Sequence, residues 1–264
     1  MLAIEATGLT RRFGTFTAVD KLDLSVPEGG IFAFLGPNGA GKTTTVKMLS
    51  TLLKPSEGRV KLCGVDAWAQ PLEARRLLGI VFQDPSLDDE LTAVENLRLH
   101  ADLYDVPRAG LAERIQSMLA LVELQDRAQE PVKRFSGGMK RRLEIARALL
   151  HEPRLIFLDE PTVGLDPQTR AHLWGYVTKL CKERGITVFV TTHYMEEAER
   201  WAKRIAVIDH GKIVALGSPA SLKKAAKAKT LEEAFIKLTG HDIRAEEGSA
   251  KDRLRLAARV MGRR

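Results

Sequence analysis

A glycine-rich segment followed by a lysine and a threonine is the most chemically specific feature of the sequence. Residues 36–43 read GPNGAGKT and fit the pattern GxxxxGK[ST]. Glycines let backbone N–H groups wrap phosphate oxygens at the start of a helix. Lys42 would reach the β and γ phosphates, and the Thr43 hydroxyl would bind Mg²⁺. The sequence therefore predicts a nucleoside triphosphate site formed by Gly36, Pro37, Asn38, Gly39, Ala40, Gly41, Lys42, Thr43 and Thr44.

Two adjacent carboxylates end an apolar run further along the chain. Residues 155–162 read LIFLDEPT, so Asp159 and Glu160 follow a segment with the composition of a buried strand. Asp159 would hold magnesium through water, while Glu160 would orient or deprotonate the water that attacks the γ-phosphate. Taken alone, such a pair is more often a surface turn. Its place downstream of the phosphate loop favours the catalytic interpretation.

A third segment combines a capping serine with two glycines. Residues 135–150 read FSGGMKRRLEIARALL, in which Ser136 is a natural helix N-cap and Gly137 and Gly138 leave the first amides uncovered. The apolar residues that follow recur at helical spacing. By itself this pattern predicts only a capped helix.

The elements that position these segments alternate between strands and helices. The apolar run 31–35 enters the glycine loop, and the residues after the loop have helical spacing. Further strands are predicted at 58–63, 79–82, 155–159, 186–190 and 204–209. Such alternation indicates an α/β fold in which crossover helices join parallel strands.

One stretch interrupts this alternation. Residues 92–150 lack strand patterns and predict helices at 92–104, 108–124 and 136–150, which would form a helical insert. Beyond Gly217, helical patterns cover 219–228 and 230–239, and a charged tail follows.

Composition restricts the class of protein. The chain has 264 residues and is 44% apolar, enough for a substantial core. Its longest apolar runs fall far short of the roughly 18 to 20 residues of a membrane helix, and no secretory signal is recognisable, so we expect the cytosol. Cys63 and Cys181 lie far apart and are expected to be ordinary thiols. Residues 200–264 carry 16 basic and 7 acidic side chains, which is compatible with nucleic acid, an anionic membrane, an acidic partner or a solvated helix.

The motifs taken together resemble a known family. The phosphate loop, Gln83, SGGM at 136–139, LIFLDEPTVGLD at 155–166 and TTH at 191–193 resemble the ATP-binding cassette (ABC) transporter ATPases over about residues 2–217. The resemblance implies ATP and Mg²⁺ as ligands. It also implies a P-loop fold of ABC type, with a mixed-sheet core, an N-terminal antiparallel β subdomain and an inserted helical subdomain. That domain would span 1–240, with its helical part at about 90–150, and would leave 241–264 as a basic extension.

Roles for individual residues follow from the resemblance. Phe13 matches the aromatic that stacks on adenine, and His193 matches the histidine that contacts the γ-phosphate. Gln83 matches the glutamine that touches magnesium and water and senses the membrane partner. Asp166 matches the aspartate that bridges the two nucleotide sites of a dimer. Phosphate contacts across the dimer are implied for Ser136, Gly137 and Gly138, and metal contacts for Thr43, Gln83 and Asp159. The commoner signature LSGGQ is altered here at both ends, to Phe135 and Met139.

A finer resemblance concerns residues 82–107, 135–149, 193–219 and 231–240. These segments are similar to drug-exporter ATPases of the daunorubicin-resistance type. The implied protein hydrolyses ATP as a homodimer on the cytoplasmic face of the cell membrane, with peripheral membrane contact, and powers a separate membrane permease that exports drugs or other amphiphilic compounds. Exporters of polysaccharides, lipo-oligosaccharides and sodium share the pattern, so the cargo stays open.

Two other functions agree with parts of the sequence. A soluble ABC ATPase acting on nucleic acid or the ribosome would agree with a pI near 9.5. However, repair-type members place a long coiled coil between phosphate loop and signature, whereas fewer than a hundred residues separate Gly41 from Ser136 here. No nucleic-acid partner is therefore expected. An importer ATPase would differ in the direction of transport rather than in ATP chemistry.

Overall fold

The computed structural model describes residues 1–84 and 86–240. Its centre is a six-stranded sheet with strand order β10-β9-β3-β8-β7-β6, in which all neighbours are parallel except the antiparallel pair β9–β10. The strands are β3 (Gly30–Leu35), β6 (Leu78–Val81), β7 (Leu155–Asp159), β8 (Thr187–Thr192), β9 (Arg204–Asp209) and β10 (Lys212–Gly217). The predicted α/β fold with a mixed sheet is confirmed.

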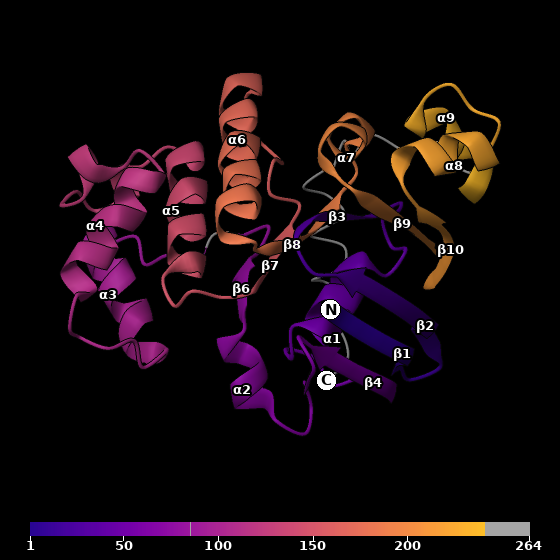
Figure 1. Cartoon of the computed structure of the whole chain (residues 1–264), viewed down its shortest axis with the longest axis horizontal. Coiled ribbons are helices and arrows are strands. Elements are labelled where there is room, and N and C mark those ends of the chain that lie inside the picture. Colours follow the sequence, from indigo (N-terminus) through magenta and orange to yellow (C-terminus); the bar gives the residue numbers. More distant parts are fainter. Residues whose placement is uncertain (85, 241–264) are drawn as a thin grey trace, which may run out of the picture.

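Both faces of this sheet are covered, which explains the continuous apolar runs of its central strands. Every residue of β3, β7 and β8 is buried, as expected for parallel strands between two layers. In Figure 1, α6 (Pro167–Arg184) and α7 (Met195–Trp201) lie on one face, and α1 (Lys42–Leu49) lies on the other. On the α1 side the core includes Phe32 stacked on Phe189, with ring centroids 5.5 Å apart.

A second, antiparallel sheet lies beyond α1. Its order is β2-β1-β4-β5, and its strands are β1 (Leu2–Phe13), β2 (Phe16–Pro27), β4 (Glu57–Leu62) and β5 (Val65–Asp66). Buried and exposed residues alternate in β2, because one face of such a sheet packs on the core. This sheet is the expected N-terminal β subdomain. The tip of the β1–β2 hairpin carries Phe13 and Phe16, which are partners in the strand register.

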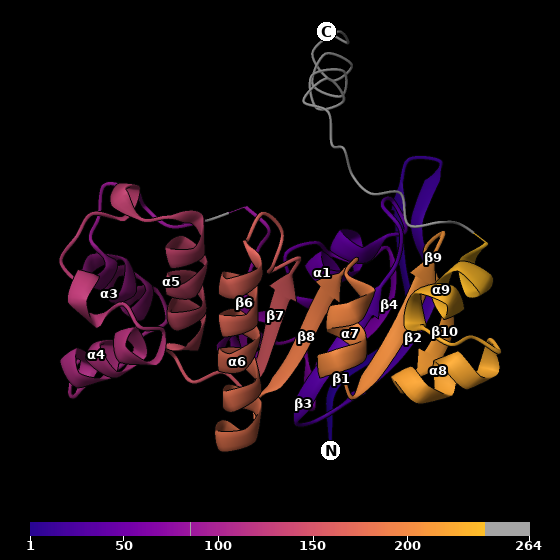
Figure 2. The same ribbon diagram turned by 90° about the horizontal axis from the view of Figure 1, so that it is seen from above.

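The predicted helical insert forms one end of the molecule (Figure 2). It consists of α3 (Ala93–Leu103), α4 (Leu111–Leu121), two short 3₁₀ turns at Gln125–Arg127 and Val132–Arg134, and α5 (Gly137–Leu149). Helix α3 begins at a capping box in which Thr92 and Glu95 satisfy each other's backbone amides. The opposite end of the molecule holds α8 (Pro219–Ala225) and α9 (Leu231–Thr239), and α2 (Pro71–Arg76) precedes β6.

Some boundaries differ from the sequence prediction. Helix α4 begins at Leu111 rather than at residue 108, because Gly110 adopts a left-handed φ of 72°. Strand β10 was not predicted; its residues alternate between exposed and half-buried, whereas its apolar residues 213–216 are consecutive and do not show that alternation. Within the described residues, no helix combines the length and hydropathy needed to span a bilayer. The predicted basic extension 241–264 lies outside the described residues, and the domain boundary at residue 240 stays a prediction.

Candidate functional site

The glycine loop joins the end of β3 to the start of α1. At Gly36 a Cβ atom would lie 2.4 Å from the carbonyl oxygen of Ile208, and at Gly41 it would lie 2.6 Å from that of Ala18. Gly41 also has a φ of 103°, so glycine is required at both positions. As the N-cap of α1, Gly41 has no side chain to bond the first helix amides. These amides are available to an anion, as in a phosphate-binding loop.

The lysine of the loop points back over it. The Lys42 ammonium lies 2.8 Å from the carbonyl oxygen of Gly36 and 3.7 Å from the carboxylate of Glu160. Its side chain is only 7% exposed. A buried ammonium with three donors on this short loop is a strong point charge for phosphate oxygens.

The two predicted carboxylates end β7 but have different surroundings. Asp159 is buried and accepts a hydrogen bond from the Thr191 hydroxyl. Burial raises the pKa of Asp159 and the charge of Glu160 raises it further, against the opposing effect of the Thr191 hydrogen bond. Glu160 adopts a left-handed φ of 49° and donates its backbone N–H to the Thr191 carbonyl at 3.1 Å. This strained conformation is uncommon for glutamate and is typical of functional sites.

A histidine from the neighbouring strand end meets this glutamate. The Nδ1 atom of His193, which follows β8, lies 2.8 Å from the Oε2 atom of Glu160. In Figure 2 the arrowheads of β7, β8 and β9 point to one edge of the sheet. The phosphate loop, Glu160 and His193 therefore converge, because the carboxyl ends of parallel strands share an edge.

A cavity of about 430 Å³ lies at this edge. Predicted residues that line it are Phe13, Pro37, Asn38, Gly39, Gly41, Lys42, Thr43, Thr44, Gln83, Glu160 and His193. Gly36 and Ala40 belong to the same loop but are not among the lining residues, and Asp159 is buried beside Glu160. Phe16, Ala18 and Val163 also line the cavity and were not predicted. Phe16 could have been predicted from a hairpin at residues 13–16, because it pairs with Phe13 across that turn.

The other predicted residues form a second cluster at the starts of two helices. Ser136 caps α5 and accepts a hydrogen bond from the Met139 amide at 3.2 Å. Asp166 caps α6 and accepts bonds from the amides of Gln168 and Thr169. A Cβ at Gly138 would lie 2.7 Å from the Thr169 methyl group, so the two helix starts are neighbours. Ser136, Gly137 and Asp166 are exposed and do not line the cavity of their own chain.

Comparison with known proteins identifies the family. The sequence model of the ABC transporter family matches residues 19–163. The chain belongs to the ABC transporter family. It is 43% identical to the daunorubicin/doxorubicin resistance ATP-binding protein DrrA of Streptomyces peucetius, over 87% of this chain and 69% of that protein. It is 42% identical to the Nod factor export ATP-binding protein I of Cupriavidus metallidurans, over 83% of this chain and 72% of that protein.

Solved structures agree with this assignment. A dimeric ATP-binding cassette in a post-hydrolysis state with ADP and Pi matches with a TM-score of 0.73 and 28% identity, over 81% of this chain and 98% of that chain. The chain is thus the ATP-binding subunit of an ABC transporter and an ATPase, as its motifs predicted.

Phe13, which the resemblance predicts to stack on adenine, contacts an arginine side chain. The Arg11 guanidinium lies 4.6 Å from the centroid of the Phe13 ring and also donates to the Lys54 carbonyl at 2.8 Å. One face of the ring is therefore occupied by a cation–π contact. The residue as a whole remains 46% exposed, and it lines the cavity.

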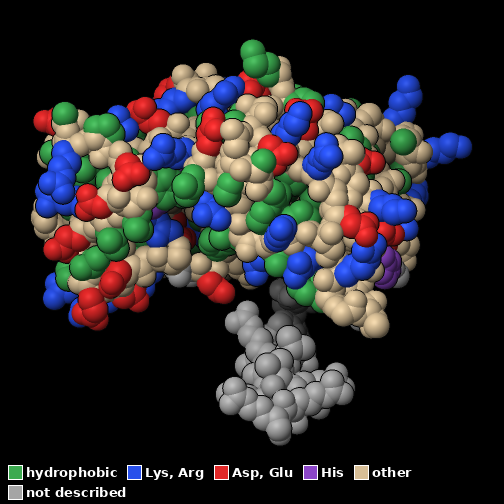
Figure 3. Space-filling model, turned by 90° about the horizontal axis from the view of Figure 1, so that it is seen from below, with side chains coloured by type: hydrophobic (Ala, Val, Ile, Leu, Met, Phe, Trp, Pro, Cys, Tyr) green, Lys and Arg blue, Asp and Glu red, His purple; other side chains and the backbone are tan. Residues whose placement is uncertain are grey.

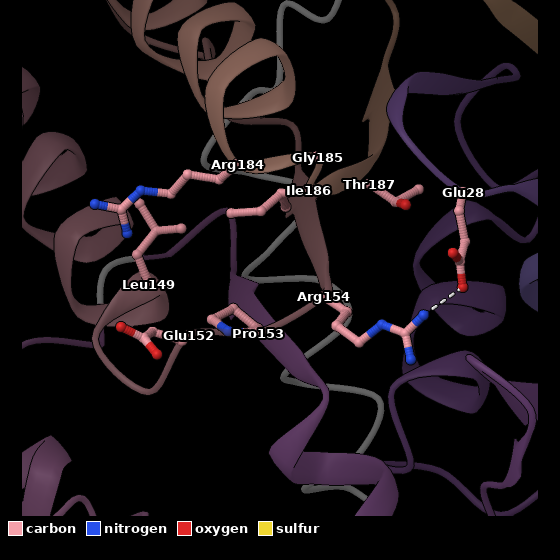
Figure 4. Close-up of a pocket in the computed structure, with 9 residues that line it drawn as sticks. All are labelled: Glu28, Leu149, Glu152, Pro153, Arg154, Arg184, Gly185, Ile186 and Thr187. Carbon is pink, nitrogen blue, oxygen red and sulfur yellow. Dashed lines mark hydrogen bonds and ion pairs between the residues drawn. The ribbon is translucent and has the colours of Figure 1, made fainter.

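A second cavity of about 430 Å³ lies at the opposite edge of the ATPase sheet (Figure 4). It is formed where β7 and β8 begin, and none of the predicted site residues lines it. Arg154 is paired with Glu28 at 2.7 Å across this cavity. Glu28 compensates the charge of this guanidinium, and the lining residues do not include the phosphate loop.

Proposed function

We propose that this ATPase works as a pair of identical chains on the cytoplasmic face of a membrane and powers a separate permease that exports drugs or other amphiphilic compounds. The main support for the ATPase mechanism is that Lys42, Glu160 and His193 lie together in one cavity. Support for export comes from relatives whose names describe drug resistance and Nod factor export.

In this mechanism the phosphate loop and Lys42 hold the β and γ phosphates, while Glu160 acts on the attacking water. Glu160 is a suitable base because its strained turn directs the carboxylate toward Lys42 and His193 rather than into solvent. His193 restrains the Oε2 atom, while Oε1, which lies 3.7 Å from the Lys42 ammonium, is the oxygen that would accept the proton of water. His193 is also the candidate contact to the γ-phosphate.

Magnesium fits the oxygen donors at the site. Thr43 and Gln83 line the cavity, and Asp159 lies buried next to Glu160. A hydroxyl, an amide oxygen and a carboxylate form a hard donor set of the kind Mg²⁺ prefers alongside phosphate and water. A nearby cation would also favour the ionised form of Asp159, whose pKa is raised by burial. When bound, Mg²⁺ would neutralise charge that develops between the β and γ phosphates.

The exposed helix starts imply that a second chain completes the site. Ser136, Gly137 and Asp166 lie outside the cavity of their own chain, although the helix N-terminus at Ser136 is suited to an anion. In a head-to-tail dimer of equal chains, this end of α5 would reach the γ-phosphate bound by the partner subunit. ATP would then close the dimer, and hydrolysis would open it.

Surface charge gives no separate indication of a nucleic-acid ligand on the face drawn in Figure 3. Basic and acidic side chains of the described residues are interspersed there rather than gathered in one basic patch. Of the 16 basic residues of 200–264, seven lie in 241–264, outside the described residues. Contact between that extension and anionic lipid stays a prediction.

Reconstitution tests the transport function. The chain should co-purify with an integral membrane permease from its native membrane, and ATPase activity of the pair in vesicles should rise on addition of an amphiphilic anthracycline. A permease variant that lacks its cytoplasmic loops serves as the control and should not bind the ATPase. Failure of the pair to associate, or stimulation by RNA instead of the anthracycline, would contradict the proposed partner.

A further inference from the structure

A buried group of charged side chains on α5 contacts the chain around Gln83. Glu144 is completely buried and Arg141 is 5% exposed, although both residues normally prefer solvent. Arg141 lies 3.1 Å from Glu144, and Arg147 lies 3.9 Å from it. Burying these charges costs free energy that an apolar trio of the same size would not cost. Their retention in the core therefore calls for a role beyond packing.

Arg141 holds the two peptide groups that flank the Cα atom of Gln83. Its guanidinium donates to the carbonyl oxygen of Phe82 and, at 3.0 Å, to that of Gln83. Guanidinium presents its donors in a fixed fork, so contact with two consecutive carbonyls fixes orientation as well as position.

Glu144 and Arg147 hold the same loop a few residues later. Glu144 accepts the Ser86 amide at 2.9 Å, and Arg147 donates to the Ser86 carbonyl at 2.6 Å. These contacts are to the main chain and therefore act on the path of the loop, and both residues also bond the Ser86 hydroxyl. The neighbouring Arg142 differs, because it donates to the Val122 carbonyl at the end of α4, within the helical insert.

We infer that Arg141 and Glu144 are positioning residues that hold Gln83 in the ATP cavity and couple the position of Gln83 to that of α5. The inference rests on the proposed function, in which Gln83 contacts magnesium and water. Arg141 lies five residues after Ser136 on the same helix, a distance of about 7.5 Å at 1.5 Å per residue. A shift of α5 when its start meets the partner's γ-phosphate is thereby transmitted to Gln83.

A double-mutant cycle tests this coupling. Arg141→Met keeps the side-chain volume but removes both carbonyl contacts, and should lower kcat about 10- to 100-fold at saturating ATP by misplacing Gln83. ATP affinity should stay unchanged, and the Mg²⁺ concentration for half-maximal activity should rise. The double variant Arg141→Met/Gln83→Ala should have the same kcat as Gln83→Ala alone, because Arg141 acts through Gln83. Arg142→Met, its neighbour on α5, is the matched control and should keep wild-type kcat.

Two outcomes overturn the inference in distinguishable ways. Losses from Arg141→Met and Gln83→Ala that multiply would show that Arg141 does not act through Gln83, and would leave the proposed function intact. A Gln83→Ala protein with wild-type kcat would reject the role of Gln83 itself.

Hydrogen exchange provides a measurement that does not depend on activity. The Ser86 amide should exchange faster in Glu144→Ala than in the wild type, whereas an unchanged exchange rate would overturn the contact. If Arg141→Met does not fold, Arg141→Lys takes its place, since it keeps the charge but reaches only one carbonyl. It should then show a smaller fall in kcat with the same rise in Mg²⁺ requirement.

Discussion

Replacement of Glu160 by glutamine is expected to lower kcat about 10²- to 10⁴-fold, the contribution typical of a positioned general base. The amide is nearly isosteric with the carboxylate, so the contact to His193 and the unusual turn at residue 160 can persist. However, an amide cannot accept a proton from water. ATP should therefore bind with near wild-type affinity and accumulate unhydrolysed in closed dimers.

Steady-state ATPase assays and size-exclusion chromatography with ATP measure these two effects. Glu183→Gln, on the exposed surface of α6, is the control and should behave like the wild type. Turnover by Glu160→Gln near the wild-type rate would show that another group acts on the water.

Replacement of Lys42 by alanine should weaken binding of MgATP at least about tenfold, which corresponds to roughly 1.4 kcal/mol. The ammonium is the charge most directly over the loop, 2.8 Å from the Gly36 carbonyl oxygen. Its loss also leaves the buried Glu160 without the cation 3.7 Å away. A phosphate entering this cavity would then face an uncompensated carboxylate.

Calorimetric titration with MgATP measures the change. Lys61→Ala, an exposed substitution on β4, matches the loss of charge away from the cavity and should leave the dissociation constant unchanged. Equal affinities for Lys42→Ala and the wild type would reject the phosphate loop as the nucleotide site.

Much of this site was predictable because local sequence determines it. The run 31–35, the glycine loop and the helix that follows are contiguous, so the motif is visible in the sequence, although the close approaches at Gly36 and Gly41 come from Ile208 and Ala18. The acidic pair at 159–160 was equally clear, since a buried parallel strand reads as a continuous apolar segment. Their convergence followed from the shared edge of parallel strands.

Other features depend on partners far away in the sequence. The contacts of Arg141 and Glu144 with residues 82–86 join segments more than fifty residues apart, and in the sequence they look like ordinary exposed charges of a helix. The left-handed turn at Glu160 likewise depends on Thr191. Strand β10 was not predicted because its sequence, KIVALG, does not alternate apolar with polar residues, although its burial alternates.

In the proposed dimer each nucleotide site combines the phosphate loop of one chain with the start of α5 from another. Gly137 is the best position to test it, because a Cβ there meets no described atom within 4 Å, whereas at Gly138 it would clash with Thr169. Gly137→Glu should therefore leave its own chain folded while its carboxylate repels the partner's γ-phosphate. Lys42→Ala disables the other half of the site.

The decisive measurement is the ATPase rate of purified dimers that contain one Lys42→Ala chain and one Gly137→Glu chain. Each homodimer should be inactive, while the mixed dimer should regain activity because one of its two sites pairs an intact loop with an intact helix start. Wild-type dimers purified in the same way set the reference rate. Mixed dimers no more active than either parent, or an active Gly137→Glu homodimer, would contradict the shared site.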